Sequence, residues 1–141
     1  MKKMSNYSQN VKPMLSLGEA LNSVFSNYAN FSGRARRSEY WWFTGLIAII
    51  SLLFNFMQIA MLMQGDNSLY TLFQIVSVVF GLGTFLPILS VTVRRFHDIG
   101  KSGWNWLWGL IPLIGWIMVL VWMCQDSDVV ANEYGESPKY N

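Results

Sequence analysis

The chain has 141 residues and a formal net charge of +2, and only 13% of its residues are charged whereas 52% are hydrophobic. A soluble domain of ordinary composition carries about 25% charged residues, and the polar sequence here is too short to cover three helices that are apolar on every side. The composition therefore excludes an ordinary soluble domain and favours one compact, all-α domain in a membrane.

Residues 1–14 form a polar segment that carries Lys2, Lys3 and Lys12, and we interpret it as a mobile tail. The segment has a basic start but no uninterrupted apolar core, so we expect no cleavable signal peptide. The first apolar helix would then direct its own insertion. We assign residues 15–138 to a single membrane domain.

A short amphipathic helix is predicted at about residues 16–29. Ser16 is followed three residues later by Glu19, which is the spacing of a capping box, and apolar residues then recur at helical spacing. The segment is too short and too polar to cross a bilayer. We expect it to lie along the membrane interface or, alternatively, to pack beneath the transmembrane helices without lipid contact.

Three long runs without a charged residue or histidine follow, at 40–65, 67–93 and 102–125. As helices they would be about 36 to 40 Å long, which exceeds the roughly 30 Å of a hydrocarbon core. They predict a bundle of three transmembrane helices, at about residues 41–63, 69–93 and 103–124. In the third of these, Pro112 and Gly115 suggest a break midway. Residues 126–141 form a polar, acidic tail.

Aromatic residues gather where the first and third predicted helices begin. Tryptophan and tyrosine rings favour the headgroup boundary of a bilayer, so these residues are predicted to be interfacial anchors. They are Tyr40, Trp41, Trp42, Trp104, Trp106 and Trp108. A lipid or quinone site at the tryptophan-rich stretch is the alternative to simple anchoring.

The distribution of Lys and Arg predicts the orientation, because positively charged flanks resist export. Six of these residues precede the first predicted transmembrane helix, none separates the first from the second, three separate the second from the third, and Lys139 follows the third. With three crossings, nine of the ten basic residues lie on one side. We therefore expect a cytoplasmic amino terminus and a carboxyl terminus outside.

This topology places two charged motifs, "GRARRSEY" and "RRFHDIGKSG", at the same cytoplasmic face. Because an unpaired charge near hydrocarbon costs about 2.5 to 3.5 kcal/mol at a helix centre, the acids should pair across the motifs. Glu39 should pair with Arg94 or Arg95. Asp98 should pair with Arg34 or Arg37. The predicted charge cluster comprises Arg34, Arg36, Arg37, Glu39, Arg94, Arg95, His97, Asp98 and Lys101.

Pairing leaves about four positive charges over, because the six cations of the cluster meet only two acids. At about 1 kcal/mol per basic residue near an anionic leaflet, this surplus is expected to bind anionic lipid headgroups or an acidic protein partner. The alternative is that the cluster only orients and anchors the bundle.

The motifs "FSGRARRSEYWWF", "RRFHDIGKSGW" and "IPLIG", with a weaker ending "NEYGESP", resemble the bacterial "domain of unknown function 805" family of small inner-membrane proteins. The resemblance runs from about Phe31 to Pro138. It implies a multi-span protein of the bacterial inner membrane, and it supplies no established activity. The family usually carries a basic residue near the end of this region, where the present chain has Asp126, Asp128 and Glu133.

Catalysis and metal binding find little support in the sequence. His97 lies beside Asp98, but adjacent residues rarely align for general acid–base chemistry, and no nucleophile stands near. One histidine and one cysteine, Cys124, do not make a usual metal site, and there is no phosphate-binding loop, so no cofactor is expected. "GRARR" abuts the bilayer, so no nucleic-acid partner is expected.

The predicted function is that of a non-enzymatic membrane interaction or assembly protein whose cytoplasmic cluster binds anionic lipid or an acidic partner. The runner-up is an oligomeric small transporter or channel component, which would need several copies because the predicted helices hold no mid-membrane charge. A membrane enzyme that acts on phosphorylated lipid is the third hypothesis. Assembly of the chain into a homo-oligomer is compatible with the sequence.

Overall fold

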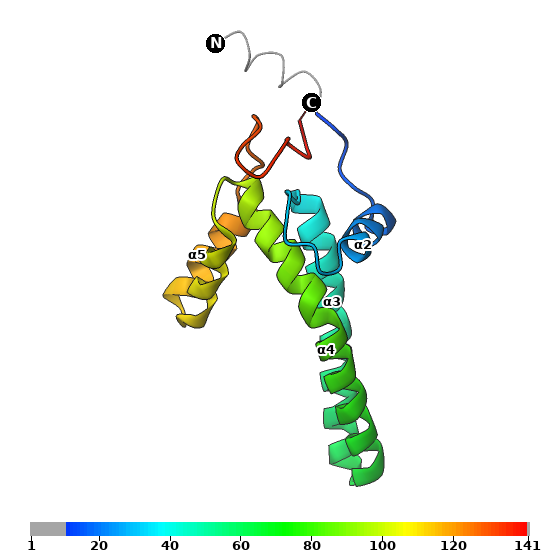
Figure 1. The fold of residues 1–141 in the computed structure, drawn as a ribbon. Helices are drawn as coiled ribbons and strands as arrows, with labels where there is room; N and C mark the ends of the chain where they lie inside the picture. Colours follow the sequence, from blue (N-terminus) through cyan, green and yellow to red (C-terminus); the bar gives the residue numbers. More distant parts are fainter. Residues whose placement is uncertain (1–10, 141) are drawn as a thin grey trace.

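The computed structural model describes residues 11–140, so the interpretation of residues 1–10, with Lys2 and Lys3, as a mobile tail lies outside the described residues. The helices are, in order, α2 (Leu17–Ser26), α3 (Arg37–Gln64), α4 (Asn67–Asp98), the 3-10 helix η1 (Gly103–Leu110) and α5 (Ile114–Cys124). This confirms the predicted all-α class. Figure 1 shows α3 and α4 extending away from the end of the molecule that carries the tail after α5.

The two candidate membrane-spanning helices, α3 and α4, form an antiparallel hairpin. Their apolar windows have mean hydropathies of 2.2 and 2.1, and at 1.5 Å per residue the helices are about 42 and 48 Å long. Gly65, at a φ of 74°, ends α3, and the Asp66 side chain accepts a hydrogen bond from Leu69 N at 2.9 Å to begin α4. Gln58 Nε2 donates to Ser77 Oγ at 2.6 Å, so this amide joins the two helices.

Helix α2 begins with the predicted capping box. Ser16 Oγ accepts from Glu19 N at 3.3 Å, and the Glu19 carboxylate accepts from Ser16 N at 2.7 Å. The helix ends at Ser26, before the predicted residue 29. It packs against α3, and Val24 and Phe43 lie in their shared apolar core. The capping prediction is therefore confirmed, and α2 rests beside the first turns of α3 (Figure 1).

Residues 103–124, which were predicted to form a third transmembrane helix, do not form one continuous helix. η1 and α5 pack against each other as a hairpin (Figure 1), and they are joined by a turn in which Leu113 has a left-handed φ of 62°. α5 has 11 residues, so it is about 16 Å long and reaches only about half-way across a hydrocarbon core. The suggested break at Pro112 and Gly115 is confirmed. Its physical basis is backbone contact, since a Cβ at Gly115 would lie 1.8 Å from Trp108 O.

The structure brings residues 11–12 and 139–140 together, whereas three crossings would place the two ends of the chain on opposite sides of a membrane. Because η1 and α5 turn back, the tail returns to the end at which α3 begins (Figure 1). Lys12 N donates to Lys139 O at 2.9 Å, and Val11 and Tyr140 form an isolated antiparallel bridge. Residues 11–14 are thus held against the tail rather than free.

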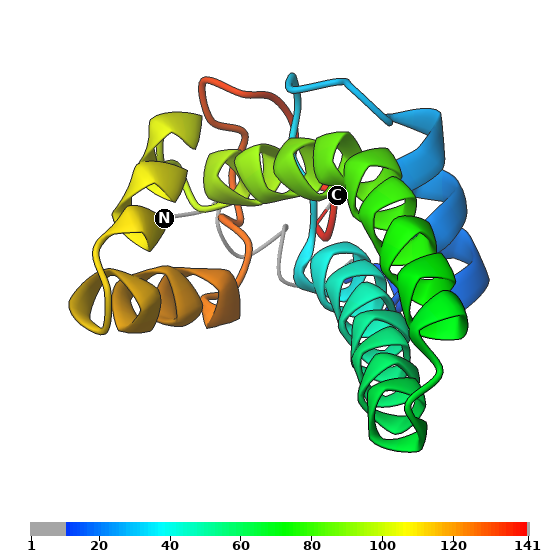
Figure 2. The same cartoon turned by 90° about the horizontal axis from the view of Figure 1, so that it is seen from below.

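The carboxyl-terminal half of α4 diverges from α3, which makes room for the second hairpin. Pro87 lies inside α4, and a proline removes one helical hydrogen bond and permits a bend. Figure 2 shows the bend, with α3 and α5 lying apart from each other below the carboxyl-terminal half of α4. All the described elements therefore converge at one polar end.

Candidate functional site

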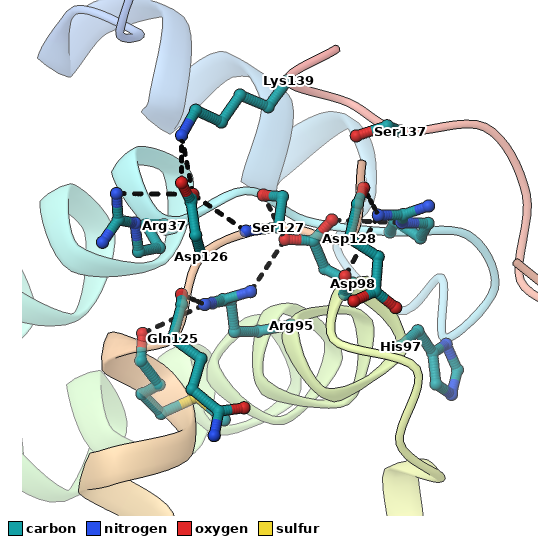
Figure 3. A network of polar contacts seen from close by, with 12 residues as sticks. Arg37, Arg95, His97, Asp98, Gln125, Asp126, Ser127, Asp128, Ser137 and Lys139 are labelled. Carbon is teal, nitrogen blue, oxygen red and sulfur yellow. Dashed lines mark hydrogen bonds and ion pairs between the residues drawn. The ribbon is translucent and has the colours of Figure 1, made fainter. Parts of the chain in front are cut away.

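Three segments far apart in the sequence meet at this end. Residues 34–39 lead into α3, residues 94–98 end α4, and residues 125–135 follow α5. Figure 3 shows the side chains of Arg95 and Asp98 pointing toward the tail residues Gln125 and Ser127. The two charged motifs thus lie together, as the sequence predicted, and the tail joins them.

Asp98 is the centre of the buried network. Its carboxylate accepts hydrogen bonds from Arg34 Nε at 3.1 Å, from Arg95 Nη1 at 2.7 Å and from Ser127 Oγ at 2.6 Å. The side chains of Arg34 and Asp98 are only 1% and 0% exposed. Of the two predicted partners of Asp98, Arg34 is confirmed, whereas Arg37 pairs elsewhere. Three donors from three segments thus converge on one buried carboxylate, and removing that carboxylate would leave buried charges without a partner.

Arg34 fastens the tail to the end of α4 through all of its guanidinium nitrogens. Besides the Asp98 carboxylate, Nη2 donates to Asp98 O at 3.0 Å and to Asp128 O at 2.7 Å. Nη1 donates to Val130 O at 3.0 Å and to Gly135 O at 3.2 Å. Gly135 has a φ of 124°, which favours glycine. The planar five-donor group of arginine suits this position, and no other side chain offers it.

Arginines also bind the carboxyl end of α5. Arg95 Nη2 donates to Met123 O at 3.3 Å and to Gln125 O, and Arg37 Nη1 donates to Cys124 O at 3.2 Å. The last carbonyls of a helix lack partners within it and carry the negative end of the helix dipole. The arginines of the cluster therefore supply hydrogen-bond donors and positive charge to the last carbonyl groups of α5.

Glu39 and Arg94 form a second buried pair, with Arg94 Nη1 2.9 Å from Glu39 Oε1. This confirms one of the two predicted pairings of Glu39. Ala35 N also donates to Arg94 O at 3.0 Å, so the backbones meet as well. Nε and Nη2 of Arg94 have no hydrogen-bond partner among residues 11–140. The pair locks the start of α3 to the end of α4.

His97 and Lys101 contact aromatic rings. The His97 ring stacks on that of Tyr134, with centroids 3.8 Å apart, and its Nδ1 lies 3.1 Å from a backbone carbonyl oxygen. The side chains of His97 and Asp98 thus have different partners. Lys101 Nζ lies 5.1 Å from the centre of the Trp122 ring, a cation–π contact. Within residues 11–140, no three His, Cys, Asp or Glu side chains gather to hold a metal ion.

At the exposed rim of the site, Asp126 is shared by Arg37 and Lys139. Arg37 Nη2 lies 3.4 Å from Asp126 Oδ1, and Lys139 Nζ lies 2.7 Å from the same oxygen. Burial raises the pKa of the Asp126 carboxyl, but hydrogen bonds, led by that from Lys139, outweigh this effect and set the pKa below its ordinary value. The Arg37 and Asp126 side chains are each 45% exposed, so their pair is a weak one.

A cavity of about 830 Å³ opens beside this rim, and we call it the rim cavity. It combines aromatic, cationic and acidic side chains, namely Trp41, Trp42, Lys12, Arg36, Arg37, Lys139 and Asp126. Trp42 is fixed there, because its Nε1 donates to Leu15 O at 3.0 Å. Arg36 Nη2 donates to Lys12 O at 3.1 Å, which holds the amino-terminal segment over the cavity.

The other predicted anchors differ in their surroundings. Trp104 is 74% exposed, as an anchor in a bilayer would be. Trp106 and Tyr40 pack against the small apolar core around Phe96 and Trp122, so they help to hold the hairpin. Trp108, which is also exposed, meets the edge of that core through an edge-to-face contact.

Sequence reasoning missed the contribution of the tail. Ser127 and Asp126 bind the cluster, and Asn132 Nδ2 donates to His97 O at 2.8 Å. Two signals pointed there. The break around Pro112 implied a change of direction, and the acidic residues of the tail complement the basic surplus that two internal acids left unbalanced.

Comparison with known proteins agrees with the helices that could cross a membrane. Residues 28–136 match the family described as "Protein of unknown function (DUF805)". "Inner membrane protein YhaI" of Escherichia coli K12 is 42% identical over 118 residues, covering 84% of this chain and 93% of the relative. "Inner membrane protein YhaH" of the same strain is 34% identical over 122 residues, covering 82% and 93%. No solved structure matches. The chain therefore belongs to the DUF805 family of proteins of unknown function.

Proposed function

We propose that this chain is a non-enzymatic inner-membrane protein that binds anionic lipid headgroups at the cytoplasmic face. The observation that carries the proposal is the rim cavity, whose charged lining is Lys12, Arg36, Arg37, Lys139 and Asp126. Four cations against one carboxylate leave a surplus of positive charge beside two tryptophans. Tryptophan rings favour the depth of the headgroups, and basic residues there attract anionic lipid.

The proposed orientation places both termini in the cytoplasm. In this arrangement α3 and α4 cross the inner membrane, and the η1–α5 hairpin enters it from the cytoplasmic side and returns. All ten Lys and Arg residues of the sequence then lie on one side, because none lies between α3 and α4. This distribution supports a cytoplasmic polar end more strongly than three crossings would.

In this proposal, the buried charges stabilise the fold and the charges of the rim cavity bind the ligand. Arg34, Arg94 and Arg95 hold the helix ends and the tail together, since their charges are already paired with Asp98 and Glu39. The rim cavity has four cations and one carboxylate, and this surplus of positive charge is available to a ligand. We favour a lipid phosphate over an acidic protein as the ligand, because the cavity is lined by two tryptophans and tryptophan rings favour the depth of the headgroups.

The test compares lipid retention by the full-length protein and two variants in detergent, measured by native mass spectrometry. The wild type should retain phosphatidylglycerol in preference to phosphatidylethanolamine. Replacing Lys12 and Arg37 together by glutamine should weaken that binding by about tenfold or more, since each basic residue contributes about 1 kcal/mol. Lys101→Gln, a cation outside the cavity, should change nothing. A wild type without preference, or an equal loss in Lys101→Gln, would refute the proposal.

A further inference from the structure

A second, apolar cavity of about 420 Å³ lies between α3 and α5, and we call it the interhelical groove. Its walls are Trp41, Gly45 and Ala48 on α3 and Trp116, Leu120 and Met123 on α5. Beyond Trp41, the α3 wall consists of the small residues Thr44, Gly45 and Ala48, and large apolar residues form the α5 wall. Figure 2 shows these helices apart from each other, both below the carboxyl-terminal half of α4, with α5 packed on η1 instead.

The groove and the rim cavity adjoin at Trp41. Trp41 lines both of them, and the consecutive residues Met123 and Cys124 line the groove and the rim cavity respectively. The charged side chains are all at the rim, because no residue that lines the groove is ionisable except Tyr40. From Arg37 at the rim to Ala48 in the groove is about 16 Å along α3 at 1.5 Å per residue.

The groove also has firm walls. Trp116 Nε1 donates to Gly109 O at 2.8 Å, which fixes the largest ring on the α5 side. The carboxyl end of α5 is held by Arg37 and Arg95, as described above. The amino end is held by the close approach of Gly115 to Trp108. α5 therefore keeps its distance from α3 without packing onto it.

We propose that the groove and the rim cavity together form one site for an anionic glycerophospholipid, with the phosphate at the rim and an acyl chain between α3 and α5. The combined site has the same arrangement of charged and apolar parts as the lipid. In this proposal its cations lie at the membrane surface, and the apolar groove leads from them toward the bilayer centre. This inference rests on the proposed function and extends it, because binding of a headgroup alone would not need the groove.

Gly45 offers a direct test, since a Cβ built on it meets nothing within 4 Å. Gly45→Leu should therefore fold, and its side chain should occupy the groove. Gly81 on α4 is equally open and lies outside the groove, so Gly81→Leu is the matched control. The probes are palmitoyl-oleoyl phosphatidylglycerol and dihexanoyl phosphatidylglycerol, which share a headgroup and differ in chain length. Binding to the full-length protein is measured by native mass spectrometry.

Gly45→Leu should weaken binding of the long-chain lipid by about tenfold, which is the effect of about two methylenes left unburied. It should leave the short-chain lipid unaffected, and Gly81→Leu should match the wild type with both. Equal binding of the long-chain lipid by Gly45→Leu and wild type would overturn the acyl-chain site and leave the headgroup site standing. A dimeric wild type that Gly45→Leu makes monomeric would show that a second copy fills the groove, which also overturns it. If the wild type binds neither lipid, the proposed function fails as well.

Discussion

Arg34 and Asp98, which are 64 positions apart in the sequence, are joined twice: Arg34 Nε donates to the Asp98 carboxylate at 3.1 Å, and Arg34 Nη2 donates to the Asp98 backbone carbonyl at 3.0 Å. The same guanidinium also holds the tail at Asp128, Val130 and Gly135. One side chain thus ties together the start of α3, the end of α4 and the segment after α5. The first role of the charge cluster is therefore structural, because it holds these three segments together.

Asp98→Asn should destabilise the protein strongly. The substitution removes the negative charge that compensates Arg34 and Arg95 at a position with no exposed side-chain surface. Breaking a buried pair in this way costs about 3–5 kcal/mol. The free energy of unfolding in detergent micelles measures the loss, and Asp128→Asn, which changes an exposed carboxylate, is the control. Equal stability of the two variants would contradict the role given to Asp98.

Arg34→Lys should release the tail although it keeps the charge. A lysine ammonium is a single point, and it does not reproduce the planar group that reaches four backbone carbonyls and one carboxylate. We expect rapid proteolytic cleavage between residues 128 and 135 in this variant and slow cleavage in the wild type. Lys101→Arg is the control, because the Lys101 ammonium lies over the Trp122 ring. Unchanged protection of the tail would show that charge alone holds it.

The ion pairs of the charge cluster could be predicted because the sequence contains few charged residues. Glu39 and Asp98 had few basic partners within reach once both motifs were placed at one face, and the structure uses Arg94 and Arg34. The path of the third apolar segment could not be predicted in the same way. A run without charge shows that a helix is able to cross a bilayer, and it does not show whether the chain turns back half-way.

That turn depends on short-range geometry that hydropathy does not record. Leu113 adopts a φ of 62° with a ψ of −71°, and Gly115 allows the backbones of η1 and α5 to touch. The return of the tail then follows, and with it the contacts that Asp126 and Ser127 make with the cluster. With three crossings, Lys139 would lie on the side of the membrane opposite the other basic residues. The turn between η1 and α5 instead brings the tail, and Lys139 with it, back to the end of the fold that carries the charge cluster.

The orientation is open to a direct test with fusions. Green fluorescent protein fused after residue 141 should fluoresce, and alkaline phosphatase at the same place should be inactive, because the tail packs against the start of α3, at the end of the fold that we propose to be cytoplasmic. Alkaline phosphatase inserted between Gly65 and Asp66, in the α3–α4 turn, should be active. An active alkaline phosphatase at the carboxyl terminus would mean that the third apolar segment crosses after all.

Gly115→Ala should disrupt the η1–α5 hairpin. The added Cβ would lie 1.8 Å from Trp108 O, which is backbone and has little freedom to move away. Overpacking of this kind costs about 1–3 kcal/mol and sometimes more. Gly109→Ala is the matched control, because a Cβ there meets nothing within 4 Å. A lower midpoint of thermal unfolding in Gly115→Ala alone is the expected result, and equal midpoints would argue against the close contact.

The contacts of Asp126 should weaken in acid. Its folded-state pKa lies below the ordinary value of 3.8, because hydrogen bonds led by that from Lys139 outweigh burial. A carboxyl with a depressed pKa contributes stability that is fully present above the ordinary pKa and is lost as the pH falls through the folded value. Hydrogen exchange of the tail amides should therefore show less protection below about pH 4 than at pH 6, after correction for intrinsic rates. Asp126→Asn should show the reduced protection at both pH values and no step between them. A step that persists in this variant would assign the pH dependence to another carboxyl group.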